Sequence, residues 1–577
     1  MDFFFSALNT VNAIIWHDAV LYITLGVGVL FTLWSGFSQY RALTHGVQVI
    51  RGVYDEAGDP GAISHFQALS AALSATVGLG NIGGVAVAIA LGGPGAVFWM
   101  WVIGAVGMAL KLTEVGQSMI YRNTDDPEEP HGGPMWVARK GFEEMGYGAA
   151  GKVVGGVFCV TLLISTITGG NMFQAWNVGV VTFNATNGAL PKVGAGIILA
   201  VLVGAVILGG IKRIGAVAGK LVPFMCGLYL VSALFVLITE IGALPEAFRL
   251  IFTHAFSPSH AEGAFIGGTA GYAFLWGMKR ALFSSESGQG SAPIAHSAAK
   301  TTEPVREAVV AGLEPFIDTL VVCTLTALVI LTSGAWNRPG EAVYDHVPEF
   351  SRSGEEWTIG VLPLPHRTDE ARVVARGDFT GYEPVFLIAR YGEASGDTGD
   401  RLQRVNGHLR EVTGGGALEV VWDTVPVAAS AEPPEIVDGH VYVEYPGAAL
   451  TTYAFDTAAP GLGTWLVLAA SWLFALSTAI SWSYYGEQGV VYLFGARAVL
   501  AYRVIYCICI IVATLPIIDS DAQLDALSAL GTGVMLWANI PIMLVFGPRM
   551  MRAYHDYMRR LDAGEFHPHA AKKLTEL

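Results

Sequence analysis

Long apolar runs dominate the chain and set its structural class. Eleven of them approach the length of about 20 residues that an α-helix needs to cross a bilayer. This pattern predicts an all-α polytopic membrane protein. We expect the spans near residues 18–37, 66–90, 96–121, 154–182, 194–210, 217–239, 264–278, 309–333, 463–486, 500–518 and 523–547.

The second run is interrupted by small and polar residues, in LSATVGLGNIGGVAVAIALGGP from Leu73 to Pro94. Each glycine disfavours a helix by roughly 1 kcal/mol relative to alanine, so we expect the helix to unwind within Gly78–Gly84. Unwound backbone inside a membrane survives only where protein buries it or where it lines a polar cavity. Such a break offers free N–H groups that suit a carboxylate and free C=O groups that suit Na⁺.

The seventh run is short and continues into a polar, Gly- and Ser-rich stretch, RALFSSESGQGSAPIAHSAAK. A shortened and glycine-interrupted span is a second indication of a discontinuous helix. It follows the first interrupted run by five spans, which is the spacing that two five-helix inverted repeats would give.

One segment, residues 337–445, differs from the rest because it has no apolar span, no Lys and no Cys. Its short alternating runs are typical of a small β-rich domain; they are WTIGVLPL, ARVVA, PVFLIARY, ALEVVWD and HVYVEY. Residues 335–461 hold twenty acidic residues and nine arginines, a net charge of −11 out of −15 for the chain. We expect a solvated acidic insert, and no motif in it identifies a partner.

Lys and Arg are concentrated in one set of loops and in the C-terminal tail, whereas the short loops on the other side hold only Lys192 and Arg249. This bias predicts a plasma (inner) membrane protein with the N-terminus and the insert outside and the C-terminus in the cytoplasm. The first residues lack the basic region of a signal peptide, so we expect the first span to be retained. The predicted parts are a transport domain at 1–336 and 446–548, the insert at 337–445 and a cytoplasmic tail at 549–577.

Composition and motifs argue against a soluble protein, an enzyme and a nucleic-acid binder. Hydrophobic residues make up 53% of the chain and charged residues only 14%, against about 25% charged in ordinary domains. The Gly-rich patches lack the Lys–Ser/Thr ending of a P-loop and the strand of a dinucleotide site. The histidines show no zinc-type pairing, and we expect His65, His131 and His296 in loops or at membrane edges.

Several polar groups inside spans are candidates for a site, and each also has a structural interpretation. Lys111 and Glu114 are one helical turn apart, and we favour an ion pair over a substrate contact. Asn171 and Gln174 could bind a polar ligand or bridge helices.

Ser477 and Thr478 could bond back to their own helix or complete a shell of oxygen ligands around a small cation. Phe274, Trp276 and Gly277 precede the second polar stretch, and the aromatic rings could form a lid or an interfacial belt.

Six segments together resemble the alanine or glycine:cation symporters, also called the sodium:alanine symporter family. The matching segments are ALSATVGLGNIGGVAVAIALGGPGAVFWMW, HGGPMW, TGGNMFQAW, KRALFSSESGQGSAPIAH, EPFIDTLVVCTLTALVILTSGAW and ISWSYYGEQGVVYLFG. That family is similar to the wider LeuT-type transporters. The resemblance implies a LeuT-like 5+5 inverted repeat preceded by one extra helix, which agrees with eleven transmembrane helices.

The resemblance also implies Na⁺-driven uptake of a small neutral amino acid, chiefly alanine or glycine. N–H groups around Leu79 and Gly80, next to Gly78, would hold its carboxylate, with Thr76 and Asn81 at the substrate or at a second cation. Backbone oxygens of Ser74 and Val77 and the hydroxyls of Ser477 and Thr478 would hold Na⁺. The residues that would line the pocket are Gln174, Phe274, Trp276, Gly277 and Trp482.

Two departures from the family pattern stand out. The loop that usually reads RGLFSNEAG is RALFSSESG here, and the insert lies between segments that the family joins closely. Two alternative functions stay open at this point. One is the same fold with H⁺ coupling or another solute, and the other is an amino-acid sensor that signals through the insert.

Overall fold

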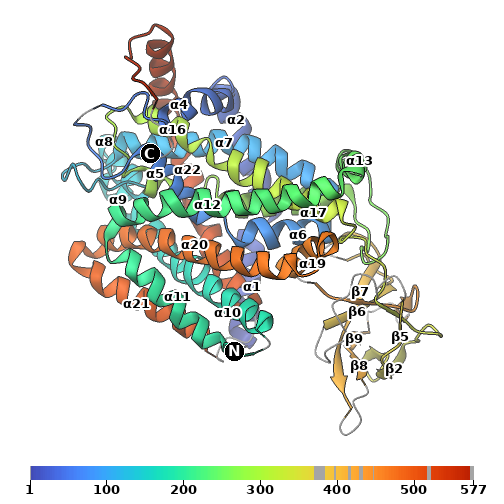
Figure 1. Ribbon diagram of the computed structural model, residues 1–577. Coiled ribbons are helices and arrows are strands. Elements are labelled where there is room, and N and C mark those ends of the chain that lie inside the picture. The colour runs from blue at the N-terminus through green and yellow to red at the C-terminus, as the bar shows by residue number, and fades with distance from the viewer. Residues whose placement is uncertain are drawn as a thin grey trace.

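The computed structural model describes residues 2–56, 58–186, 188–368, 384–395, 398–412, 418–427, 433–445, 447–515 and 521–571. Within them, seven helices are long and apolar enough to cross a membrane, or eight if one bent pair counts as a span. Figure 1 shows these helices packed into one body, with the strands gathered at the end where α13, α17 and α19 lie. The chain is therefore a multi-pass integral membrane protein.

The helices of the first half are joined by short connections, except for the longer loops before α5 and before α8. They are α1 (Asp2–Ile15), α2 (Asp18–Trp34), α3 (Ser38–Arg41), η1 (Ala42–Gly46), α4 (Val47–Ile50), α5 (His65–Thr76), η2 (Gly80–Gly84), α6 (Val85–Gly92), α7 (Gly95–Tyr121), α8 (Pro134–Glu144), α9 (Gly148–Ile167), η3 (Thr168–Met172), α10 (Phe173–Ala185), α11 (Lys192–Ile207) and α12 (Gly210–Thr239).

The second half contains the remaining helices on both sides of the strands. They are η4 (Ile241–Ala243), α13 (Leu244–His254), α14 (Ala270–Ser285), α15 (Ala292–His296), α16 (Pro304–Ala311), η5 (Phe316–Cys323), α17 (Thr324–Thr332), α19 (Ala448–Ala458), α20 (Leu462–Phe494), η6 (Ala496–Ala498), α21 (Val499–Val512) and α22 (Asp521–Asp562).

The predicted break of the second span is present but is shorter than expected. Helix α5 begins with a capping box between Ser64 and Gln67 and ends at Thr76. Val77 then takes an extended conformation, and the chain bends by 54° before Gly80. The stretch Gly80–Gly84, which we expected to unwind, is a π-helix.

The second discontinuity lies later in the chain than the predicted span of 264–278. Helix α14 starts at Ala270, after the N-cap Thr269, and continues to Ser285. Glu286, Gly288 and Gly290 then have positive φ angles of 51°, 84° and 83°. At Gly290 a Cβ atom would lie 2.4 Å from Cγ of Pro134, so only glycine fits this turn. The polar stretch is therefore a compact turn between α14 and α15.

Eleven described segments of the region between α17 and α19 are strands, and all their pairings are antiparallel. One sheet has the order β4-β8-β7-β6-β11-β1-β5 with β10 added to β6, and the other has the order β2-β3-β9. Of the alternating runs in the sequence, ARVVA lies outside the described residues. The strands are β1 (Ala342–Val343), β2 (Ser351–Ser353), β3 (Glu356–Thr358), β4 (Val361–Pro363), β5 (His366–Arg367), β6 (Pro384–Arg390), β7 (Leu402–Glu411), β8 (Leu418–Trp422), β9 (Val425–Pro426), β10 (Glu435–Ile436) and β11 (His440–Val443).

The strands have their own apolar core and also contact the membrane body. Val385, Leu387 and Val420 are fully buried between strands. A separate apolar cluster joins Ala264 and Ile266, in the loop before α14, to three side chains of the sheet: Phe386, Ile388 and Tyr442. The sheet therefore packs directly on the loop that leads into the second broken helix.

Candidate functional site

A small cavity of about 60 Å³ lies between the two broken helices. Its walls come from the end of α5 and the first break, from α9, η3 and α10, from the end of α14 and the turn after it, and from α20 and α22. The lining residues are Ala75, Thr76, Gly78, Leu79, Gly80, Ser165, Gly169, Phe173, Gln174, Phe283, Ser284, Glu286, Gln289, Thr478, Trp482, Ser528 and Thr532. Since a water molecule needs about 10–15 Å³ of such space, the cavity suits a ligand of only a few non-hydrogen atoms.

Oxygen atoms gather on one side of the cavity, where α5 meets α20. Ser74 donates its hydroxyl to the carbonyl oxygen of Ser477 at 2.7 Å. The Thr478 hydroxyl donates to the carbonyl oxygen of Ser74 at 3.2 Å, and the Ser477 hydroxyl is shared between Phe474 O of its own helix at 2.9 Å and Ser74 O at 3.3 Å. All three side chains are at most 3% exposed. These hard oxygen atoms, which lie close together on two helices, are the donor set that a small cation such as Na⁺ prefers.

The break itself contributes backbone groups to the same region. Val77 is fully buried, and its extended conformation ends the α5 hydrogen-bond pattern. On the other side, the first N–H groups of η2 have no acceptor inside their own helix, because a helix cannot satisfy its first turn. Leu79 and Gly80, which begin this turn, line the cavity. The two ends of the break therefore present opposite partial charges.

Three buried polar atoms of cavity-lining side chains have no hydrogen-bond partner among the described residues: Gln174 Oε1, Gln289 Oε1 and Ser165 Oγ. Each of the two amide groups is held by its nitrogen, since Gln174 donates to Gly169 O at 3.1 Å and Gln289 donates to Leu282 O at 3.2 Å. A buried acceptor without a partner costs about 1–3 kcal/mol, so these atoms favour a ligand that donates hydrogen bonds.

Asn81 lies behind the break, and among the described residues it is not part of the cavity lining. Its Oδ1 accepts the N–H of Gly78 at 2.7 Å, and its Nδ2 donates to Asp318 Oδ1 at 2.6 Å. Ser284 and Thr319 also donate to the Asp318 carboxylate, at 3.0 and 2.8 Å. Asp318 is fully buried, and it is not among the site residues predicted from the sequence. An acidic residue inside an apolar run was the signal that could have found it.

The remaining expected pocket residues lie in different places. Trp482 lines the cavity and packs closely against Gly170 of η3. Phe274 stacks with Tyr22 and meets the edge of Trp99, at centroid distances of 5.4 and 4.8 Å, outside the cavity.

Gly277 faces the backbone of Ala96, and Trp276 lies beneath the charged ends of Lys279 and Arg280. Because α14 runs on to Ser285, the cavity takes its α14 contacts from Phe283 and Ser284 instead.

Asn171 acts as a bridge between helices. Its Nδ2 donates to the carbonyl oxygen of Tyr506 on α21 at 2.7 Å, and the side chain is fully buried. Lys111 and Glu114 form the ion pair that we favoured, with a distance of 3.8 Å, but Lys111 is closer to Glu314, at 3.2 Å. His65 and His296, which we expected in loops or at membrane edges, are buried.

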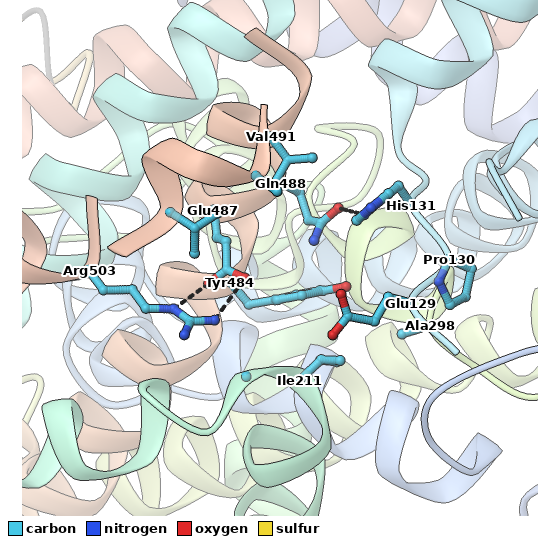
Figure 2. Close-up of a pocket in the computed structure, with 13 residues that line it drawn as sticks. Glu129, Pro130, His131, Ile211, Ala298, Tyr484, Glu487, Gln488, Val491 and Arg503 are labelled. Atoms are coloured by element: carbon cyan, nitrogen blue, oxygen red, sulfur yellow. Dashed lines mark hydrogen bonds and ion pairs between the residues drawn. The ribbon is translucent and has the colours of Figure 1, made fainter. Parts of the chain in front are cut away.

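A second and larger cavity, of about 230 Å³, lies where α12 begins and α20 ends. Figure 2 shows Arg503 paired with Glu487 on one side of it and His131 bonded to Gln488 on the other. The Arg503–Glu487 contacts measure 2.8 and 2.9 Å. Neither break lines this cavity, so the smaller one is the better candidate for binding a specific ligand.

Comparisons with known proteins identify the family of the chain. "Sodium/alanine symporter AgcS" of Methanococcus maripaludis is 44% identical over 340 residues, which cover 59% of this chain and 73% of the relative. "Putative sodium/proton-dependent alanine carrier protein YrbD" of Bacillus subtilis is 30% identical over 565 residues, 96% of this chain and 93% of the relative. "Probable sodium/glutamine symporter GlnT" of the same organism is 37% identical over 332 residues, 57% of this chain and 66% of the relative.

A sequence profile of the sodium:alanine symporter family matches residues 1–349 and 415–572. These ranges contain both broken helices and every residue of the candidate site described above. The gap between them falls within the strand-forming region. The chain therefore belongs to the sodium:alanine symporter family.

Proposed function

We propose that this protein imports a small neutral amino acid, alanine or glycine, together with Na⁺. The main support for this proposal is that Ser74 of α5 contacts Ser477 and Thr478 of α20 beside the break at the end of α5. The Thr478 hydroxyl now donates to the Ser74 carbonyl and the Ser477 hydroxyl is shared with Phe474 O, so a bound cation would take the place of these protons and receive the lone pairs of both hydroxyl oxygens. Carbonyl groups of Ser74 and Val77 complete the proposed Na⁺ site.

The substrate occupies the small cavity in this proposal. Its carboxylate binds the N–H groups around Leu79 and Gly80, next to Gly78 and Thr76, because the start of a half-helix carries partial positive charge. Its ammonium group donates to the unpartnered oxygen of Gln174. Trp482 limits the space left for the side chain, which favours alanine or glycine over a larger amino acid.

Asp318 and Asn81 form the second proposed cation position, behind the break. The buried Asp318 carboxylate accepts a hydrogen bond directly from Asn81. The family resemblance also assigned Phe274, Trp276 and Gly277 to the pocket. In this conformation they pack outside the cavity. We therefore propose that they act in the movement of α14 and do not contact the substrate.

The proposed architecture is a 5+5 inverted repeat after one extra helix, with eleven membrane-spanning helices. Its support is the pair of discontinuities, at Val77–Leu79 and at 286–291, in the first helix of each proposed repeat. The proposed orientation has the N-terminus and the insert outside and the C-terminus in the cytoplasm, and the Lys and Arg distribution supports it. The cavity in Figure 2 is then a vestibule on the cytoplasmic side.

Uptake of labelled alanine into proteoliposomes tests the proposal, with a Na⁺, Li⁺ or pH gradient imposed in separate experiments. We expect uptake with Na⁺. A tenfold inward gradient supplies about 1.4 kcal/mol per ion. Uptake that follows only the pH gradient would replace Na⁺ by H⁺ as the coupling ion. Binding of alanine without uptake would favour a sensor over a transporter.

A further inference from the structure

A group of buried titratable side chains lies apart from the cavity, where four segments meet. His65 is the first residue of α5, and His296 is the last residue of α15. Glu307 is in α16, and Glu314 lies in the short helical segment that leads into η5. All four are at most 3% exposed. Titratable groups so deeply buried inside a membrane protein need a specific reason to be there.

The four side chains form a continuous chain of contacts. The Glu307 carboxylate lies between two imidazoles, with one of its oxygens against Nδ1 of His65 and the other against Nδ1 of His296. The second ring nitrogen of His296, Nε2, lies 2.6 Å from Oε1 of Glu314. Both nitrogens of His296 therefore face carboxylate oxygens.

The number of protons that this geometry requires can be counted. Each of the three nitrogen–oxygen contacts needs one hydrogen atom, because an ionised carboxylate only accepts and an unprotonated ring nitrogen also only accepts. A neutral imidazole carries one proton, so His65 and His296 together supply two. The third hydrogen bond requires one additional proton, shared among His296, Glu307 and Glu314.

The surrounding charges also favour an additional proton. Lys111 Nζ lies 3.2 Å from Glu314 Oε2, and Arg122 at the end of α7 is the other nearby fixed cation. Against these two cations stand five carboxylates, since three further acidic residues face the same region: Glu114 of α7, Glu286 after α14 and Asp318 of η5. The hydroxyl of Tyr485 approaches from α20. Unpaired buried charge is costly, so proton uptake stabilises this arrangement.

A metal ion does not explain the cluster. Among the residues that the structure describes, no group of three or more His, Cys, Asp or Glu has the arrangement of a metal site. Glu114 does not contact the histidines: its Oε2 accepts the N–H of Gly290 at 3.1 Å and Nδ2 of Asn539 at 2.8 Å, and its Oε1 faces Lys111 at 3.8 Å. The ligand that completes the hydrogen bonds is a proton.

We propose that His65, His296, Glu307 and Glu314 form a proton-binding site that holds one exchangeable proton and ties the start of α5 to α15 and α16. When that proton leaves, two lone pairs face each other and one of the three hydrogen bonds is lost. The half-helix α5, which ends at the break beside the cavity, is held at His65 by Glu307, so release of the proton weakens the contacts that fix Glu307 and His296 and loosens this anchor of α5. Protons thereby control how easily this half-helix moves.

Glu314→Gln tests the proton count without removing a hydrogen bond. The amide that this substitution introduces would donate to His296 Nε2, and neutral His296 would then donate from Nδ1 to Glu307. All three contacts are satisfied with no additional proton. Glu307→Gln achieves the same, because its amide accepts from His65 and donates to His296. If Glu314→Gln does not fold, Glu307→Gln tests the same proton count.

The measurement is the number of protons that purified, unliganded protein releases on titration with base. We expect the wild type to release one proton more than either variant, above the ordinary range of Glu near about pH 4.3. The control is Glu128→Gln, because Lys212 at 2.7 Å holds the pKa of that exposed carboxyl below its usual range. The number of protons released by Glu128→Gln should differ from the wild-type number only in the acidic range. Identical wild-type and Glu314→Gln curves above that range would overturn the proposal.

A second measurement tests the link to α5, and this part rests on the proposed transport function. With a fixed Na⁺ gradient, the apparent alanine affinity of the wild type should change by up to about tenfold per pH unit, the limit for one linked proton. Both Glu→Gln variants should change by less than about twofold. The same pH profile in wild type and variants would overturn the link. If no protein takes up alanine but the proton difference persists, the proton site stands and the proposed function fails.

Discussion

Asp318 and Asn81 are joined by a 2.6 Å hydrogen bond between a buried carboxylate and the amide that also receives the N–H of Gly78. The negative charge on η5 is thereby connected, through one side chain, to the backbone of the break in the first broken helix. A change at Asp318 should therefore reach the cavity although Asp318 does not line it.

Asp318→Asn should raise the Na⁺ concentration needed for half-maximal alanine uptake by about tenfold or more, a loss of about 1.4 kcal/mol or more in cation binding. The reason is that the variant removes the charge but keeps a side chain of the same shape. Thr332→Val is a matched control on α17, because its hydroxyl bonds only to Leu328 of its own helix. Unchanged Na⁺ dependence in Asp318→Asn would reject a cation position at this carboxylate.

Thr478→Ala should raise the Na⁺ requirement by about ten- to a hundredfold. Loss of one hard oxygen ligand to a charged group is worth about 1.5–3 kcal/mol. Alanine uptake measured against Na⁺ concentration gives the result directly. Ser483→Ala, on the same helix, removes a hydroxyl that bonds to Ile480 of that helix at 2.7 Å, and its Na⁺ dependence should stay normal. Equal effects of the two variants would contradict the role of Thr478.

Gln174→Ala should weaken alanine binding by about tenfold, because one hydrogen bond to the ammonium group of the substrate is lost. Isothermal titration of the purified protein in saturating Na⁺ measures this affinity. Asn177→Ala is the control one turn further along α10, where the amide bonds back to Phe173 at 2.8 Å. Normal alanine affinity in Gln174→Ala would remove this residue from the proposed pocket.

Gly170→Ala should destabilise the protein and reduce transport. A Cβ atom there would lie 2.3 Å from Cγ of Trp482, so the indole ring must shift, at a cost of about 1–3 kcal/mol. Thermal unfolding in detergent measures the loss. Gly156→Ala, in the preceding helix, meets nothing within 4 Å and should keep or raise the stability. A Gly170→Ala protein as stable as the wild type would show that the ring has room to move.

The break in α5 could be predicted from sequence because several glycines within one apolar run act locally on helix stability. Its true extent, Val77–Leu79, could not, since a π-helix over Gly80–Gly84 depends on how neighbouring elements pack against it. One of these is α19, which brings Ala448 N within 3.0 Å of a Cβ at Gly83. Such contacts join residues more than 360 positions apart.

The buried acidic residues show a different limit of prediction from sequence. Lys111 and Glu114 were recognised because both lie in one predicted span, and their pairing was interpreted correctly. The same rule applied to the span at 309–333 would have found Glu314 and Asp318. The role of His65 and His296 is harder to predict, because their partners come from a separate helix and no periodic pattern marks the contact.

The two ends of the strand-forming region lie side by side. Strand β1, near its start, pairs with β11, near its end, through Ala342↔Val441, and Arg338 bonds to the carbonyl oxygen of Val443. A segment whose two ends leave and rejoin the membrane body at neighbouring positions can be gained, lost or exchanged during evolution while the order and packing of the helices stay the same. The region between α17 and α19 is thus a natural grafting point, where a foreign domain could be carried by this transporter.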